Sequence, residues 1–300
     1  MWETALAFAI WGTYGSVLTA ARIDPALTAI TRSAGLGLIL AIASAVIARL
    51  RGPREITAAI PWRSAVLWLS GSVLLVDEVL YAFSAVSGPV AIIGLAYGCV
   101  PILAPLLSRL AGTDDARAMT PRHWGCLALA FIGNAMVFAE LQAAHVHFTL
   151  AAVFAFLAGL LFTLMPVCSA RLQQGGLGTW AVLKGQGAVA AILAVPLLAL
   201  LIGLGLIEPA RSGHAGIARR SLEMGAISAA VFTLTPFYLW YRGIARCGVA
   251  RTSIFAFAEP LVATLCSLLV LKDAPPTPLL ILGAALVLCA IAVSARSGGE

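Results

Sequence analysis

The sequence has little charge. Of its 300 residues only 11% are Asp, Glu, Lys or Arg, whereas 61% are hydrophobic. A soluble globular domain carries about a quarter charged residues and about half apolar ones. The scarcity of charge therefore argues against a soluble domain and predicts a protein whose surface lies largely in lipid.

Reactive side chains are scarce in the apolar segments. The four histidines fall in predicted loops, and the sequence contains no HExxH motif, no Ser–His arrangement within a span and no phosphate-binding glycine loop. His145 and His147 lack an evident third metal ligand, and Asp114 lies beside Asp115 among arginines, where a solvated cluster is the simpler interpretation. We therefore expect no metal, no cofactor, no enzymatic activity and no ATP-driven pump.

Cysteine pairs and basic patches are also missing. The six cysteines sit singly in or beside apolar segments, with no CxxC pair, which predicts small packing residues rather than a disulfide framework. No basic patch interleaved with aromatic residues occurs, so we expect no nucleic-acid partner. The first apolar run lacks the basic n-region of a signal peptide and is expected to remain as a span.

Long apolar runs are abundant. Segments near 20 residues, bounded by charges or by glycine and proline, are the length that crosses a bilayer as a helix. Ten such segments occur, at 3–21, 27–48, 64–86, 90–110, 124–141, 149–168, 180–206, 222–241, 252–271 and 278–295. Because the loops between them are short, the predicted fold class is an all-α integral membrane protein with ten transmembrane helices in one membrane domain.

The basic residues give the orientation. With the N-terminus inside, most of the nineteen Lys and Arg residues fall in cytoplasmic loops or the C-terminal tail, and fewer fall outside. Cytoplasmic loops of membrane proteins carry an excess of such residues. We therefore predict that both termini are cytoplasmic.

The two halves of the sequence resemble each other. The segment "PILAPLLSRL" at 101–110 aligns with "PLVATLCSLL" at 260–269, and 24–43 aligns with 176–195, which pairs Arg32 with Lys184. Because each half has five spans, an odd number, the second copy must be inverted in the membrane. The predicted organisation is two inverted five-helix repeats, 1–143 and 144–300, the arrangement of alternating-access carriers.

Acidic residues inside the spans mark a candidate cavity. They are Asp77 and Glu78 in the third span and Glu259 in the ninth, and an ionisable group at membrane depth usually faces water or a partner. Aromatic residues three positions apart share a helix face with one another or with these acids, although each could equally be a packing or interface aromatic. The candidate cavity residues are Trp11, Tyr14, Glu78, Tyr81, Tyr97, Phe162, Tyr238, Tyr241 and Glu259.

Two basic residues lie within spans. Arg32 and Lys184 are each about a turn or more inside their helices, where snorkelling to the headgroups is the simplest explanation. A latch on a neighbouring helix, or a contact with a substrate carboxylate, is the alternative.

Prolines inside spans predict hinges, because proline deletes a backbone hydrogen bond. We assign this role to Pro101, Pro236 and Pro260, and we expect Pro260 to leave the carbonyl of Ala256 without its partner, so that the ninth helix bends beside Glu259. The fifth and tenth spans contain no internal proline and are expected to lie at the periphery.

The chain resembles a known family. Trp11-Gly12, the segment "PALTAITR" ending at Arg32, and "YRGIARCGVARTSIFAFAEPLVATLCSLLVLKD" in the second half resemble the EamA-type ten-helix members of the drug/metabolite transporter (DMT) superfamily. Members usually carry Gly-Glu after the ninth span, where this chain has Lys272-Asp273. The third-span segment "DEVLYAFSAVSG" is similar to YddG-type amino acid exporters.

The resemblance implies a secondary transporter of the bacterial inner membrane that moves small amphipathic metabolites by alternating access. Amino acids, including aromatic ones, are the first expectation for the cargo, and export is implied by resemblance alone. The expected partners are a small-molecule substrate and lipid, with coupling to protons or exchange through Glu78 or Glu259. The alternatives are uptake of quaternary amines such as choline through an aromatic cage, and, from other classes, an intramembrane enzyme or a passive channel.

Overall fold

The computed structural model describes residues 1–21, 23–51, 59–87, 96–113, 120–142, 150–207, 215–266 and 277–296. All regular structure within these ranges is helical. Five described stretches are long and apolar enough to cross a bilayer: Pro25–Leu50, Ala65–Ser87, Leu150–Gln174, Thr179–Gly203 and the continuous Gly216–Cys266. The all-helical membrane character is therefore confirmed, whereas the count of ten spans and the inverted repeat stay predictions.

The helices follow the apolar runs of the sequence. They are α1 Trp2–Ala21, α2 Pro25–Arg51, α3 Ala65–Ser87, α5 Val100–Leu110, α6 Pro121–Gln142, α7 Leu150–Gln174, α8 Thr179–Gly203, α9 Ala215–Ser228, α10 Thr235–Ser253, α11 Ala258–Cys266 and α12 Pro278–Arg296. A π-helical turn, η2 (Ala229–Leu234), precedes α10, and a 3-10 turn, η3 (Ile254–Phe257), precedes α11.

The boundary between the eighth and ninth predicted spans is a single residue rather than a loop. A loop was expected between 241 and 252, and the helical geometry of Thr235–Ser253 is interrupted within that range at Gly248. The chain changes direction inside this helix at Gly248, whose φ of 79° lies in the left-handed region that glycine adopts without a Cβ clash. The fourth predicted span is described only from Ala96 onward, and residues 90–95 lie outside the described part.

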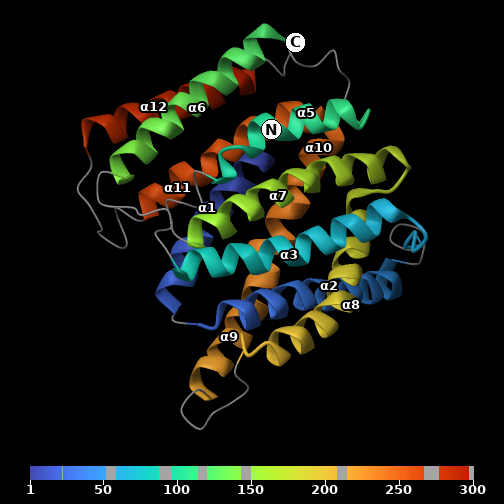
Figure 1. Ribbon diagram of the computed structural model, residues 1–300. Coiled ribbons are helices and arrows are strands. Elements are labelled where there is room, and N and C mark those ends of the chain that lie inside the picture. Colours follow the sequence, from blue (N-terminus) through green and yellow to red (C-terminus); the bar gives the residue numbers. More distant parts are fainter. Residues whose placement is uncertain are drawn as a thin grey trace.

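The straight helices α6 and α12 form a pair at one edge of the molecule (Figure 1). Their backbones touch at two glycines: a Cβ on Gly133 would lie 2.6 Å from the carbonyl oxygen of Gly283, and a Cβ on Gly283 would lie 2.5 Å from that of Gly133. Small residues allow such close helix contacts in membranes. The expectation that these two spans lie peripherally is confirmed.

On the other side of the molecule α2, α8 and α9 lie together, and α1, α3, α7, α10 and α11 fill the region between them and the α6–α12 pair (Figure 1). A Cβ on Gly12 of α1 would lie 2.6 Å from the carbonyl oxygen of Glu259 on α11. The Trp11-Gly12 pair noted in the sequence therefore brings α11, and with it Glu259, directly against α1.

The distribution of polarity is that of a membrane protein. Large apolar side chains such as Val195, Leu38 and Ile281 are 72%, 62% and 58% exposed on the outside of the bundle, as lipid contact requires. Arg32, Asp77, Glu78 and Glu259 are buried at its centre. The interior of the bundle is therefore polar at its centre, whereas its outer surface is apolar.

Candidate functional site

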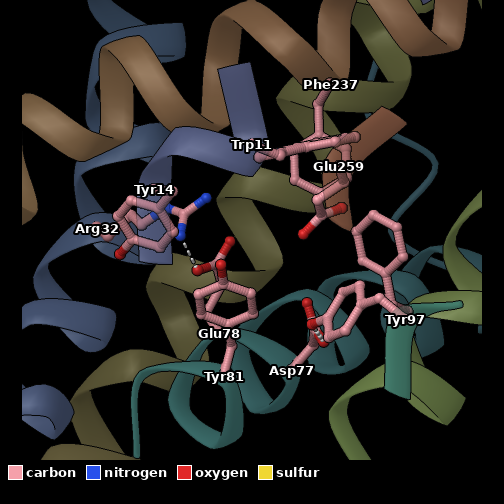
Figure 2. Close-up of a pocket in the computed structure, with 10 residues that line it drawn as sticks. Trp11, Tyr14, Arg32, Asp77, Glu78, Tyr81, Tyr97, Phe237 and Glu259 are labelled. Atoms are coloured by element: carbon pink, nitrogen blue, oxygen red, sulfur yellow. Dashed lines mark hydrogen bonds and ion pairs between the residues drawn. The ribbon is translucent and has the colours of Figure 1, made fainter. Parts of the chain in front are cut away.

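Six helices meet at a small pocket in the centre of the bundle (Figure 2). The enclosed space is about 20 Å³, which accommodates about one water molecule and not a metabolite. The lining residues, which we call the central pocket, are Trp11, Tyr14, Arg32, Asp77, Glu78, Tyr81, Tyr97, Phe162, Phe237 and Glu259.

The structure brings together most of the residues that the sequence placed in a cavity. Three candidates lie elsewhere. Tyr238 is half-buried on α10, with its ring against Trp180, and Tyr241 is fully buried but does not line the pocket. Lys184 lies on α8, half-buried and outside the pocket.

Arg32 is a buried connection between helices rather than a residue at the lipid surface. Its side chain is 3% exposed and forms an ion pair with Glu78 of α3. Its Nε donates a hydrogen bond to the Thr233 hydroxyl, and its Nη2 donates to the carbonyl oxygen of Phe232 at 2.7 Å. Because the guanidinium also lies 4.0 Å above the centre of the Tyr14 ring, snorkelling does not describe it.

The carbonyl of Phe232 is available for this contact because of Pro236. In a regular helix the N–H of residue 236 would bond to the carbonyl of residue 232, but proline has no N–H. The carbonyl oxygen of Phe232 instead accepts from Arg32 and, at 2.7 Å, from Nε1 of Trp11. Because of the proline and the π-helical turn, a backbone carbonyl of the eighth span is free to bind side chains that surround the site.

Asp77 lines the pocket, although it was not among the candidate cavity residues. It is 3% exposed and accepts a hydrogen bond from the Tyr97 hydroxyl at 2.6 Å, drawn as a dashed line in Figure 2. Adjacent residues on a helix point about 100° apart, so Asp77 and Glu78 share the interior only because α3 packs against α1, α2, α7 and α8 together. The sequence did contain a signal for Asp77, because a carboxyl group at membrane depth is rare.

Glu259 points into the pocket from the first turn of α11 (Figure 2). It is 5% exposed, and its carboxyl group makes no hydrogen bond or ion pair with another residue of the described ranges. Its electrostatic neighbours are Arg32, which attracts its charge, and Glu78, which repels it. Of the central-pocket carboxyls it is therefore the one most open to a new partner.

The three assigned prolines lie near the starts of α5, α10 and α11. Pro101 and Pro236 are second residues of α5 and α10, and Pro260 is the third residue of α11. Pro101 lies in a first turn, where a missing N–H is tolerated, whereas Pro236 and Pro260 directly follow the helical turns η2 and η3, where the hydrogen-bonding pattern of the helix changes. The expected bend at Pro260 within one long helix is corrected accordingly: the 3-10 turn η3 already divides the segment, and the carbonyl of Ala256 accepts the N–H of Ala258.

Charge in the central pocket is unbalanced. Three carboxyl groups, Asp77, Glu78 and Glu259, surround one guanidinium, and Arg32 is already paired with Glu78. A buried charge without a partner is strongly unfavourable. The remaining two carboxyl groups therefore suit protons or a cationic group of a ligand.

A second cavity of about 460 Å³ opens toward one end of the molecule. It lies between the end of α7, the start of α8 and α10, and we call it the vestibule. Its polar lining includes Thr113, Gln173, Gln174, Thr179 and Arg246. At the same end Glu3 of α1 pairs with Arg242 at 3.3 Å and with Arg246 at 3.0 Å, which ties α1 to α10.

Comparison with known proteins agrees with these features. Residues 149–296 match the EamA-like transporter family. No curated protein matches the chain. A solved crystal structure with 22% sequence identity covers 98% of this chain and 96% of its own, with a TM-score of 0.70. At that identity the likeness shows a shared fold over nearly the whole chain.

Proposed function

We propose that this chain, which belongs to the EamA-like transporter family of the DMT superfamily, is a secondary transporter for a small amphipathic metabolite that carries an ammonium group. Amino acids, including aromatic ones, are the first cargo that we propose, and export is the direction. The observation that carries the proposal is the pair of carboxyl groups, Asp77 and Glu259, that face an aromatic pocket without a cationic partner among the described residues.

The carboxyl groups supply the polar half of such a site. Glu78 is neutralised by Arg32, so an incoming ammonium would meet Glu259 and Asp77. A charge-assisted hydrogen bond in a pocket with little water is stronger than one between neutral groups. Such a contact offsets the cost of stripping water from the ammonium as it enters the protein.

The aromatic rings supply the apolar half. Tyr14 stacks on Tyr81 with ring centres 5.4 Å apart, and Tyr81 meets Tyr97 edge-on at 5.6 Å. Trp11 and Phe162 lie 5.4 Å apart and continue this aromatic wall, because the Phe162 ring lies 5.1 Å from that of Tyr97. Rings in these arrangements can separate to receive an aromatic or aliphatic side chain and can also attract a cation to their faces.

The size of the central pocket supports alternating access. A space of about 20 Å³ cannot hold an amino acid, so the described conformation is closed around the site. The vestibule, at about 460 Å³, is large enough to admit one. A carrier that exposes its site to one side at a time must pass through such closed states, whereas a passive channel has no need to close over its path.

A quaternary amine is a second candidate cargo, and one observation favours it. Three nitrogens of Arg32, the residue best suited to a carboxylate, are engaged by Glu78, Thr233 and Phe232. These contacts leave two of the five N–H donors, so the carboxylate of an amino acid would have to share the guanidinium with Glu78. A choline-like amine needs only the carboxyl groups and the rings.

We further propose that Glu259 exchanges a proton for the substrate. A carboxyl group that is buried without a partner can hold either a proton or an ammonium, but not both, and that exclusion couples two opposite fluxes. The arrangement in two inverted halves, the bacterial inner membrane and cytoplasmic termini belong to the same proposal. The packing of α2 on α8 supports the two-fold arrangement, because the internal alignment pairs 24–43 with 176–195.

The test is transport by the purified protein in proteoliposomes. Labelled aromatic amino acids, aliphatic amino acids and choline-like amines are compared for saturable uptake into vesicles preloaded with the unlabelled compound. We expect counterflow with an ammonium-bearing compound, and the preference between amino acid and choline decides between the two cargoes. Linear flux without counterflow would indicate a channel and contradict the proposal.

A further inference from the structure

Between the vestibule and the central pocket lies a layer of aromatic side chains. Phe162 and Trp240 stack with ring centres 5.1 Å apart and an interplanar angle of 13°. Trp11 packs edge-on against both, and Phe237 lies 4.8 Å from Trp11. A substrate that moves along α10 from the vestibule residue Ile244 to the pocket residue Phe237 would pass this layer at Trp240.

Two buried polar side chains lie at the depth of the layer. Tyr241 on α10 is one turn beyond the pocket residue Phe237 and three residues before the vestibule residue Ile244. Gln186 on α8 is seven residues from the vestibule residue Thr179, about 10 Å along the helix. Both side chains are fully buried.

These groups have unused hydrogen-bonding capacity. The Tyr241 hydroxyl and both polar atoms of the Gln186 amide have no hydrogen-bonding partner within the described ranges. The Tyr241 hydroxyl and the Gln186 amide lie close enough to influence each other as hydrogen-bonding groups, but they do not reach hydrogen-bonding geometry, so a small movement or a ligand between them would satisfy both. An unsatisfied buried polar group is unfavourable, and native proteins keep few of them without a purpose.

The wall of the vestibule holds Tyr241 in place. Gln173, which lines the vestibule, donates a hydrogen bond from Nε2 to the backbone carbonyl of Tyr241 at 3.1 Å. The backbone of Tyr241 is thus held by a residue of the vestibule wall.

We propose that Tyr241 and Gln186 form a polar station on the path between the vestibule and the central pocket, where they hydrogen-bond the ammonium group of the substrate as it crosses the aromatic layer. This inference rests on the proposed function. An ammonium that leaves water loses its hydrogen bonds, and the aromatic layer alone would replace them only in part. The phenol oxygen and the amide oxygen can accept hydrogen bonds from the ammonium before it reaches the carboxyl groups of the central pocket.

The test compares Tyr241→Phe and Gln186→Leu with Ser294→Ala. Ser294 on α12 is a matched control, because its hydroxyl is also buried without a partner in the described structure but lies away from the path. Counterflow rates at saturation, equilibrium substrate affinity by tryptophan fluorescence, and melting in detergent are measured for all variants.

We expect each station variant to lower the saturated counterflow rate about tenfold, because a hydrogen bond to a charged group is lost at the highest point of the path. Equilibrium affinity should change less than about twofold, and melting should not fall, since apolar replacement of an unsatisfied polar group is neutral or stabilising. Tyr241→Phe combined with Gln186→Leu should slow transport by less than the product of the single effects, because both contact one group. Gln186→Met replaces Gln186→Leu if the latter does not fold.

Two results would overturn the station. Variants that transport like Ser294→Ala, beside an active wild type, would contradict the station alone and leave the proposed function in place. A wild type without counterflow for any ammonium compound would contradict the proposed function, and the station with it.

Discussion

The centre of the molecule and its α6–α12 edge are built from the same apolar amino acids but differ in their helices. The edge helices are long and meet through glycines. In the centre, α10 and α11 follow a π-helical and a 3-10 turn, and the backbone freed at Phe232 binds Arg32 and Trp11. In a bilayer, irregular backbone is tolerated only where protein or a cavity satisfies it. Broken helices therefore mark the site, and straight ones mark the scaffold.

The largest effect is expected where the centre depends on one residue. Arg32→Met leaves Glu78 buried without its ion-pair partner and removes the contacts to Thr233 and Phe232. Loss of one partner of a buried pair costs about 3–5 kcal/mol of stability. We expect a strongly lowered melting temperature in detergent and no transport.

Combining Arg32→Met with Glu78→Leu removes both charges. This variant should recover part of the lost stability, since the buried charge is gone, but not transport. If Arg32→Met alone has the melting temperature of the wild type, the contacts of Arg32 with α3 and η2 do not stabilise the fold.

The next effect separates charge from shape at Glu259. Glu259→Gln keeps the size of the side chain and its place beside Gly12 but cannot bind and release a proton. We expect an intact fold and at least about a tenfold loss of transport driven by a proton gradient. Proteoliposome flux at several pH values and melting in detergent measure both. If Glu259→Gln transports at the wild-type rate with unchanged pH dependence, Glu259 does not couple proton movement to substrate transport.

The same small substitution in the two regions sharpens the comparison further. Gly12→Ala and Gly133→Ala each place a Cβ 2.6 Å from a backbone carbonyl, of Glu259 in the centre and of Gly283 at the edge. Each should force helices apart at a cost of about 1–3 kcal/mol. We expect both to lower melting, but only Gly12→Ala to change substrate affinity, because only there does a carboxyl group of the pocket move. If Gly12→Ala and Gly133→Ala bind the substrate with the same affinity, the distinction between site and scaffold is wrong.

The sequence predicted the scaffold better than the site. Apolar runs determine where helices form, and the absence of internal proline was enough to place α6 and α12 at the edge. Arg32, Glu78 and Glu259 could be found because charge at membrane depth is rare. Asp77 carried the same signal but was not among the candidate cavity residues, because adjacent helix residues rarely face one interior; Phe237 could not be assigned, because the π-helical turn before α10 changes which face of the helix points inward. Local sequence does not encode that rotation, and Tyr238 was placed in the cavity for the same reason.

The smallest effect concerns the aromatic wall. Tyr81 stacks on Tyr14 and meets Tyr97 in the pocket, whereas Leu286 packs between α12 and α6. Aromatic contacts contribute about 0.5–1.5 kcal/mol beyond burial, so Tyr81→Ala should weaken affinity for an aromatic substrate by about two- to tenfold. Leu286→Ala, which also truncates a large side chain, should lower stability but leave affinity unchanged. Competition of labelled substrate with aromatic and aliphatic compounds measures the difference. If Tyr81→Ala loses affinity equally for both classes, the ring shapes the pocket without recognising the cargo; if neither variant changes affinity, Tyr81 packs in the centre as Leu286 packs at the edge.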